Sequence, residues 1–122
     1  MVCDFKELDV WKRSFDFSGE VYRVTVGFPR DEIYGLTSQL RRAAVSIFSN
    51  IAEGCGRRTS KDFVGFLYNA MGSIREVESQ LMFSNGLGYL KDDELKKLTS
   101  ELDRIGKMLM SFIKYVSGLD VK

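Results

Sequence analysis

Apolar residues recur every three or four positions along most of the chain, and no other feature of the sequence restricts the fold as much. Residues three and four apart share one face of an α-helix, whereas a strand would alternate every second residue. The repeat is clearest in a run of seven residues near the C-terminus: Leu95, Leu98, Leu102, Ile105, Leu109, Phe112 and Val116. This spacing is typical of helices that pack in a left-handed bundle, so we expect an all-α fold.

Four helices are predicted from this spacing and from the residues that interrupt it. They cover approximately residues 8–26, 31–53, 60–86 and 92–116. Gly54 and Gly56 are expected to end the second helix in a left-handed cap, and Thr59 with Asp62 resembles a capping box at the start of the third. The connections are short, which forces neighbouring helices to run antiparallel. The prediction is a single domain, residues 1–122, folded as an antiparallel up-down-up-down four-helix bundle.

Two features of the composition limit the catalytic and metal-binding functions that the chain can have. The chain has no histidine, which removes the usual general base for a serine or cysteine nucleophile, the commonest zinc ligand and the histidine ligands of di-iron bundles. Cys3 and Cys55 are the only cysteines, too few and too far apart in sequence to suggest a disulfide scaffold or a metal pair, so we interpret both as reduced thiols. We therefore expect no catalytic residue, no cofactor, no metal ion and no enzymatic activity.

The sequence also bears on location. No apolar run approaches the roughly 20 residues needed to span a bilayer. The N-terminus lacks a basic segment leading into an apolar signal region. We expect a cytoplasmic protein without a membrane partner.

The first two helices are predicted to carry more apolar surface than one bundle can bury. Trp11, Phe15 and Tyr22 on helix one, and an arc from Ile33 to Ile51 on helix two, are expected to face the core. A second stripe consists of Val10, Phe17, Val21 and Val24 on helix one and of Tyr34, Val45, Phe48 and Ala52 on helix two. Soluble monomers rarely expose large contiguous apolar patches, so these eight residues are a candidate interface of a closed homo-oligomer. The alternative is irregular packing that buries part of each stripe within the monomer.

A polar stripe lies beside the core arc of the second helix. Gln39, Ser46, Asn50 and Glu53 fall within about 60° of one another at 100° per residue. Candidate partners on the third helix are Ser73, Glu76 and Glu78. The structural interpretation is a hydrogen-bond network between helices or subunits that fixes their register. The functional alternative is a carboxylate site built from Glu53, Glu76 and Glu78.

Charge is unevenly distributed, although the formal net charge is only +1. Between Leu36 and Arg75, six basic residues stand against two acidic ones. Arg57, Arg58 and Lys61 lie on the turn before the third helix, where a phosphate group would find cationic side chains and unsatisfied backbone N–H groups. An oligomer would repeat this turn and so raise avidity. The alternative is a solvated basic turn.

Three stretches carry a resemblance to a known family: QLRRAAVSIFSNIAEG from Gln39 to Gly54, Arg57-Arg58, and AMGSIREVES from Ala70 to Ser79. Together they resemble the bacterial four-helix bundle proteins called 23S rRNA intervening-sequence or S23 proteins. The resemblance extends over nearly the whole chain. It implies a four-helix bundle, frequently a homopentameric ring, in proteins often encoded within insertions in 23S rRNA genes.

Similar proteins include the accessory subunit of diversity-generating retroelements, a basic pentameric barrel that binds nucleic acid and a reverse transcriptase. The resemblance implies candidate nucleic-acid contacts at Arg41, Arg42, Arg57, Arg58 and Lys61. It implies structural polar positions at Ser46, Asn50, Glu53, Ser73 and Glu76, to which the polar stripe adds Gln39. Two functions remain open at this point: an oligomeric adaptor that binds RNA, and a protein-interaction scaffold without nucleic acid.

Overall fold

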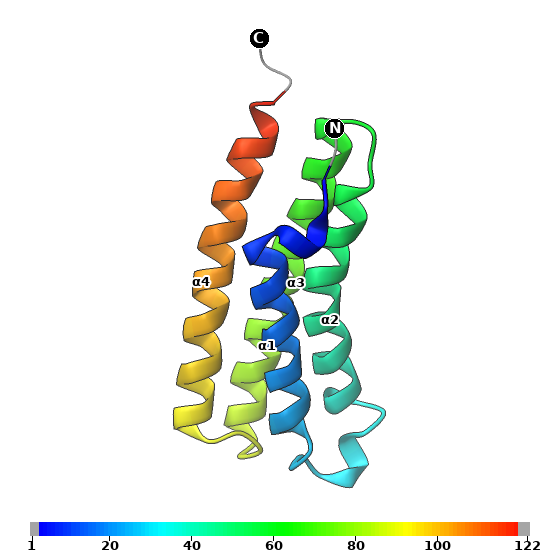
Figure 1. The fold of residues 1–122 in the computed structure, drawn as a ribbon. Helices are drawn as coiled ribbons and strands as arrows, with labels where there is room; N and C mark the ends of the chain where they lie inside the picture. The colour runs from blue at the N-terminus through cyan, green and yellow to red at the C-terminus, as the bar shows by residue number, and fades with distance from the viewer. Residues whose placement is uncertain (1–2, 120–122) are drawn as a thin grey trace.

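The fold is a bundle of four helices in which successive helices run in opposite directions (Figure 1). The structure, a computed structural model, describes residues 3–119. Its helices are α1 Asp9–Thr25, α2 Leu36–Cys55, α3 Ser60–Gly86 and α4 Asp92–Ser117, with short 3-10 helices η1 Phe5–Glu7 and η2 Arg30–Glu32 before α1 and α2. The predicted all-α class is confirmed.

The second helix begins later than its apolar spacing predicts. Residues Arg30–Glu32 form η2, and α2 starts only at Leu36. The Glu32 carboxylate accepts a hydrogen bond from the Leu36 N–H at 3.1 Å and so caps α2 from the preceding turn. A Cβ at Gly35 would lie 2.9 Å from Oε1 of Glu32, so a larger residue here would displace the capping carboxylate. Ile33 therefore precedes the helix and is 54% exposed, which makes its assignment to the core wrong.

The end of α2 is not the left-handed cap predicted for Gly54 and Gly56. Gly56 has a φ of −88°, and among the described residues only Gly88 has a positive φ. Gly54 lies inside α2, where a Cβ would meet Cδ1 of Phe63 at 2.8 Å and Cβ of Phe66 at 3.0 Å. The absence of a side chain at Gly54 thus lets α2 and α3 approach closely beside their turn.

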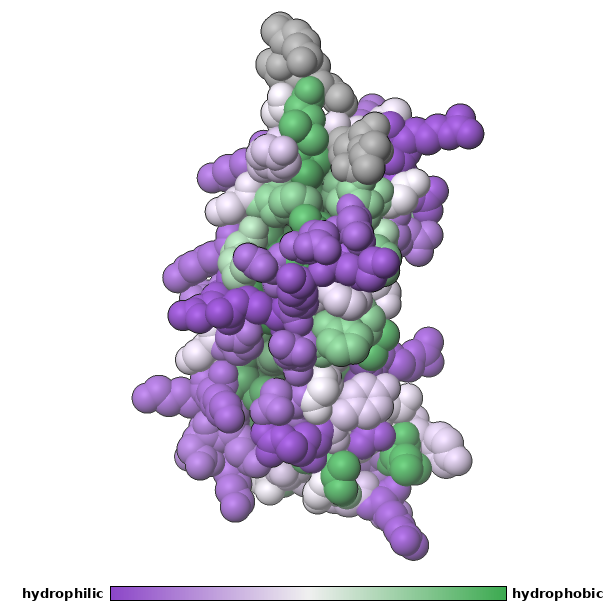
Figure 2. All heavy atoms as spheres, in the orientation of Figure 1, coloured by the Kyte–Doolittle hydropathy of each residue, from purple (hydrophilic) through white to green (hydrophobic). Residues whose placement is uncertain are grey.

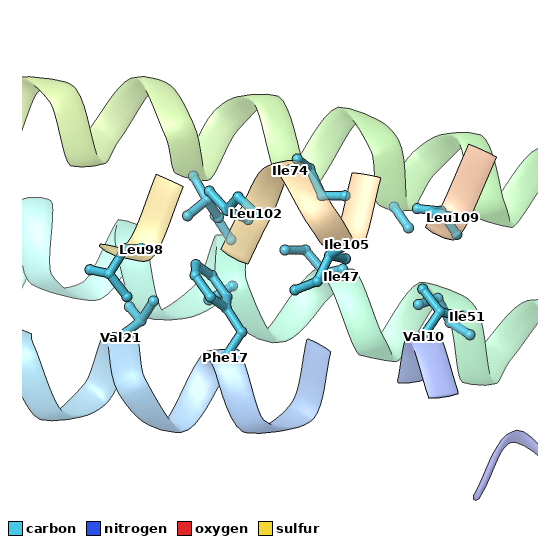
Figure 3. Close-up of a cluster of buried hydrophobic side chains, with 14 of the residues drawn as sticks. Val10, Phe17, Val21, Ile47, Ile51, Ile74, Leu98, Leu102, Ile105 and Leu109 are labelled. Atoms are coloured by element: carbon cyan, nitrogen blue, oxygen red, sulfur yellow. The ribbon is translucent and has the colours of Figure 1, made fainter. Parts of the chain in front are cut away.

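Apolar side chains from all four helices meet in one core (Figure 3). The largest fully buried side chains are Phe17, Val21, Leu40, Ile47, Ile51, Phe63, Leu67, Val77, Leu81, Leu102, Ile105 and Leu109. Burial of each such side chain contributes about 1.5–3 kcal/mol. The core face predicted for α4, and that of α2 from Leu36 onward, are confirmed. No helix in the described part of the chain has the length and apolarity needed to cross a membrane.

On α1 the core face differs from the predicted one. Val10, Phe17 and Val21, expected on an oligomer interface, are buried in the core of the monomer. Phe15 and Tyr22, expected in that core, are 51% and 45% exposed. The two apolar stripes of α1 have therefore exchanged places, and the three buried residues cannot contact another subunit from this core.

Small polar residues explain this exchange. Ser14, Ser18 and Thr25 are buried on the core side of α1. Their hydroxyl groups donate to the carbonyl oxygens four residues earlier, at 2.7 Å, 3.0 Å and 2.8 Å respectively. A hydroxyl satisfied by its own helix can be buried without an unpaired donor. The largest side chains alone therefore do not identify the buried face of α1.

Cys3 and Cys55 form a disulfide, so their interpretation as reduced thiols is wrong for this structure. They are 52 positions apart in sequence, but the α1–α2 hairpin returns the chain to its starting end. Their Cα atoms lie 5.3 Å apart, within the range that a disulfide requires. The bond ties the segment before α1 to the last residue of α2.

Candidate functional site

Aromatic side chains form a strip on the outer side of α1 and α2, which we call the α1–α2 aromatic face. It consists of Trp11, Phe15 and Tyr22 from α1 and of Val45, Phe48 and Ala52 from α2. Ring centroids lie 5.1 Å apart for Trp11 and Phe15 and 5.5 Å apart for Phe15 and Phe48. These distances are typical of packed aromatic pairs. Figure 2 shows green and pale side chains over this region among purple ones.

The predicted interface residues of α2 lie on this face. Val45, Phe48 and Ala52 are half-buried there. Tyr34 is 96% exposed in the turn before α2, and Val24 is half-buried against the core. Their contact with another subunit stays a prediction. The α1 residues of the face were missed, although aromatic residues at spacings of four and seven were visible in the sequence.

Arg41 belongs to the edge of the aromatic face. Its guanidinium carbon lies 4.6 Å from the centre of the Tyr22 ring. Its Nε donates to Oγ1 of Thr25 at 2.9 Å, and its Nη2 donates to the Tyr22 carbonyl oxygen at 3.4 Å. This arginine therefore joins α2 to α1, which leaves it less free for a phosphate group than its sequence suggests.

The α2–α3 turn carries three of the predicted cations. Nη2 of Arg57 lies 2.9 Å from the Glu53 carboxylate, and its guanidinium carbon lies 4.4 Å from the centre of the Phe66 ring. Arg58 and Lys61 are exposed, and neither forms an ion pair with another described residue. Arg58 and Lys61 are thus the available cations of the turn.

The five predicted cations do not form one patch. Arg42 is exposed on α2, in a groove shared with Glu76 of α3. It precedes Arg57 by about four helical turns, which at 1.5 Å per residue is about 22 Å. Arg42 therefore lies on the side of the bundle, whereas Arg58 and Lys61 lie at its end.

The predicted polar network connects α2 and α3 in part. Oγ of Ser46 and Oγ of Ser73 lie 2.6 Å apart, and Nδ2 of Asn50 donates to the Ser46 carbonyl oxygen at 2.8 Å. Gln39 accepts from Nε2 of Gln80 at 3.4 Å. Gln80, which is half-buried, was not predicted, because no spacing rule distinguishes it from the other polar residues of α3. The network is an inter-helix contact on the surface of the monomer.

The three carboxylates of the alternative site do not come together. Glu53 pairs with Arg57, and Glu78 pairs with Arg75 at 3.3 Å on the side of α3 that faces α4. Glu76 lies in the groove on the α2 side. Within residues 3–119 there is no group of three His, Cys, Asp or Glu side chains that could hold a metal ion. A carboxylate site from these residues is therefore not formed.

The perturbed ionisable groups lie in local contacts. A hydrogen bond from Arg23 holds the pKa of the Glu20 carboxyl below its usual value. Partial burial, together with the nearby Glu32 carboxylate, raises the pKa of the Tyr89 phenol. The Tyr89 hydroxyl donates to Oε2 of Glu32 at 3.3 Å and so links the α3–α4 turn to the α1–α2 turn. Neither group belongs to the aromatic face or to the basic turn.

Comparison with known proteins identifies the family. The family model described as 23S rRNA-intervening sequence protein matches residues 6–111. The chain belongs to this family. A crystal structure of a protein with unknown function from the S23 ribosomal protein family of Bacteroides thetaiotaomicron VPI-5482 is similar, with a TM-score of 0.77 and 24% sequence identity. The match covers 86% of this chain and 98% of that one, and at this identity it shows the fold alone.

No curated protein matches the chain. The family match confirms the resemblance expected from the sequence, and its span includes both the α1–α2 aromatic face and the α2–α3 turn. The similar structure is itself of unknown function. The chemistry of these two surfaces is therefore the basis for a functional proposal.

Proposed function

We propose that the protein is a non-enzymatic oligomeric scaffold whose copies associate through the α1–α2 aromatic face. The carrying observation is the exposure of Phe15 and Tyr22, at 51% and 45%, beside half-buried Trp11 and Phe48. Aromatic residues are enriched at the buried centres of protein interfaces, and arginine, here Arg41 over the Tyr22 ring, is enriched with them. A face of this kind on two adjacent helices gains free energy when a second copy covers it.

A closed ring is the expected form of such an assembly. Self-complementary chains commonly adopt closed symmetry, which leaves no unpaired copy of the interface. The resemblance noted in the sequence favours a homopentamer. Native mass spectrometry of the full chain measures the number of subunits directly, and a monomer at micromolar concentration would refute the scaffold.

The position of the interface is tested by two charge substitutions at phenylalanines of similar exposure. Phe15→Glu places a carboxylate within the aromatic face and should dissociate the oligomer. Phe83→Glu is the matched control, because Phe83 is 60% exposed on α3 and Phe15 is 51% exposed on α1. Sedimentation velocity distinguishes the two. Dissociation by Phe83→Glu alone would assign the interface to α3 instead.

RNA binding is the second candidate function, favoured by the exposed cations of the α2–α3 turn. Arg58 and Lys61 flank the N-terminus of α3, a helix of 27 residues whose first N–H groups favour negative charge. Each subunit of a ring would present one such turn, and several weak phosphate contacts would add through avidity. We propose that the ligand would be RNA held through its phosphates.

A salt titration tests this second candidate. Fluorescence anisotropy with a labelled structured RNA should show binding at low salt that weakens steeply as salt is raised. The double variant Arg58→Glu, Lys61→Glu should lose binding, whereas the control Lys96→Glu, Lys107→Glu on α4 changes the net charge equally and should retain it. Equal effects of the two double variants, or no binding by the unsubstituted protein at low salt, would contradict RNA binding. The protein would then be a scaffold for a protein partner.

We also propose that the assembly acts in the cytoplasm. Fractionation of the native host followed by immunoblotting measures it. Recovery of the protein outside the cytoplasm would contradict this part of the proposal.

A further inference from the structure

We propose that the disulfide between Cys3 and Cys55 is a redox-controlled latch that holds an N-terminal strap, residues 3–8, over one end of the α1–α2 aromatic face. Reduction releases the strap and enlarges the surface available to a second copy of the chain. This regulation rests on the proposed function, because the regulated surface is the one through which copies associate.

Apart from the disulfide, the strap is held on the bundle by side-chain packing, because Cys3, Phe5 and Leu8 are partly buried against the core. Oδ1 of Asp4 accepts from the Lys6 N–H at 3.1 Å, and the Phe5 carbonyl oxygen accepts from the Leu8 N–H at 3.0 Å. Within residues 3–119, no hydrogen bond joins the strap to α2, α3 or α4. The 3-10 helix η1 is only three residues long, and such short helices are unstable without outside contacts. The disulfide is therefore the covalent restraint on a strap that otherwise depends on the packing of a few half-buried side chains.

The strap covers Trp11, which is the end of the aromatic face nearest the α2–α3 turn. The centroids of the Phe5 and Trp11 rings lie 5.0 Å apart. The Trp11 ring also lies 5.1 Å from Phe15 and 6.1 Å from Phe48. Departure of Phe5 therefore adds one side of the Trp11 ring to a surface that already contains Phe15 and Phe48.

The closed position is also disfavoured by Trp11 itself. Its Nε1 is buried and has no hydrogen-bond partner among the described residues. A buried N–H group without a partner loses the hydrogen bond that it makes with water in an open state. The unpaired Nε1 is thus a local cost of the packing around Trp11, and Phe5 of the strap is part of that packing.

Opening the latch is a two-electron reduction by a dithiol. A thiolate of the reductant attacks Sγ of Cys3, which is half-buried, whereas Cys55 is 5% exposed. The S–S bond breaks, Cys55 leaves as a thiolate and takes up a proton, and a mixed disulfide joins Cys3 to the reductant. The second thiol of the reductant displaces Cys3, which also takes up a proton. The protein gains two electrons and two protons, and the reductant ends as a disulfide.

Tryptophan fluorescence monitors the position of the strap, because Trp11 is the only tryptophan of the chain. The experiment compares tryptophan emission and acrylamide quenching of the full-length protein before and after treatment with dithiothreitol, while a thiol reagent counts free cysteines. We expect reduction to shift the emission to longer wavelength and to increase quenching as two thiols appear. Cys3→Ser leaves Cys55 in place and should show the reduced spectrum with or without dithiothreitol.

Two results would overturn the latch. Two free thiols in protein purified in air would show that the bond does not form, and two thiols released without any change in emission would show that the strap stays docked. Sedimentation velocity of both redox forms then separates the latch from the scaffold. Stronger association of the reduced form supports the regulation, and equal association of both forms refutes it. Monomers in both forms would refute the scaffold, while the emission shift would still support release of the strap.

Discussion

One methyl group added at Gly54 should destabilise the bundle, because α2 and α3 leave no room for it. A Cβ at this position would lie 2.8 Å from Cδ1 of Phe63 and 3.0 Å from Cβ of Phe66, well inside the roughly 3.5–4.0 Å that is optimal for two carbon atoms. Phe63 is 1% exposed and cannot swing into solvent. Cβ of Phe66 moves only with the backbone of α3. Gly54→Ala must therefore push the two helices apart.

The magnitude follows from two opposing terms. Overpacking a well-packed core costs about 1–3 kcal/mol, and replacing a helical glycine by alanine gains up to about 1 kcal/mol. We expect Gly54→Ala to lower the free energy of unfolding by about 1–2 kcal/mol. Gly86→Ala is the matched control, because Gly86 ends α3 as Gly54 nearly ends α2 and no heavy atom lies within 4 Å of its added Cβ. The free energy of unfolding of that control should rise by up to about 1 kcal/mol.

Thermal unfolding followed by circular dichroism measures both variants. Protein concentrations must be equal, because association raises apparent stability. The midpoint of Gly54→Ala should lie roughly 5–10 °C below that of Gly86→Ala for a domain of this size. If Gly54→Ala were as stable as Gly86→Ala, α2 and α3 would not approach as closely as described, and the geometry of the basic turn between them would be wrong.

The disulfide joins cysteines that are 52 positions apart. Its reduction should lower the free energy of unfolding by up to about 4 kcal/mol in the chain-entropy model. Urea denaturation with and without a dithiol measures this loss, and an unchanged midpoint would contradict it. Phe17→Ala should cost about 3–5 kcal/mol, because Phe17 is 2% exposed, and Phe15→Ala should cost clearly less. Equal losses in the same assay would mean that the core face of α1 is misplaced. The Tyr89 phenol, whose pKa is raised above its ordinary 10.0, should contribute stability that is complete below pH 10 and is lost as pH rises through the folded pKa. Tyr89→Phe should remove that alkaline loss and Tyr34→Phe, at a 96% exposed position, should not; identical alkaline unfolding curves for both variants would refute the assignment.

The core face of α4 could be predicted because its apolar residues are largely separated from charge around the helix. Leu98, Leu102 and Ile105 are buried, whereas Lys96 and Arg104 between and beside them are exposed. Hydrophobic periodicity is reliable when only one side of a helix is apolar. The sequence therefore contains enough information to orient α4 without tertiary contacts.

The core face of α1 could not be predicted in this way. Aromatic residues occupy its outer side, and Ser14, Ser18 and Thr25 occupy part of its buried side. The decisive interactions are hydrogen bonds from these hydroxyls to the carbonyls of their own helix, and apolar spacing does not report them. The prediction of a second exposed stripe on α1 was useful, but it named the wrong side.

Sequence predicts the basic turn better than the contacts that connect distant segments. Arg57, Arg58 and Lys61 are near neighbours in sequence, so any turn between two helices keeps them together. The disulfide of Cys3 with Cys55 depends on the α1–α2 hairpin returning to its own start, which a separation of 52 residues does not reveal. Residues that are close in sequence could therefore be predicted to share a turn, whereas the contact between two distant cysteines could not be predicted.

The unequal lengths of the helices give the bundle a preferred order of opening. α1 has 17 residues and α3 has 27, so at 1.5 Å per residue α1 is about 15 Å shorter. Figure 1 shows that α1 begins well short of the α2–α3 turn and that the strap crosses the remaining space. Amide hydrogens exchange first where few long-range hydrogen bonds must break. We therefore expect this end of α1 to unfold locally first, and we expect the disulfide to limit how often it does so.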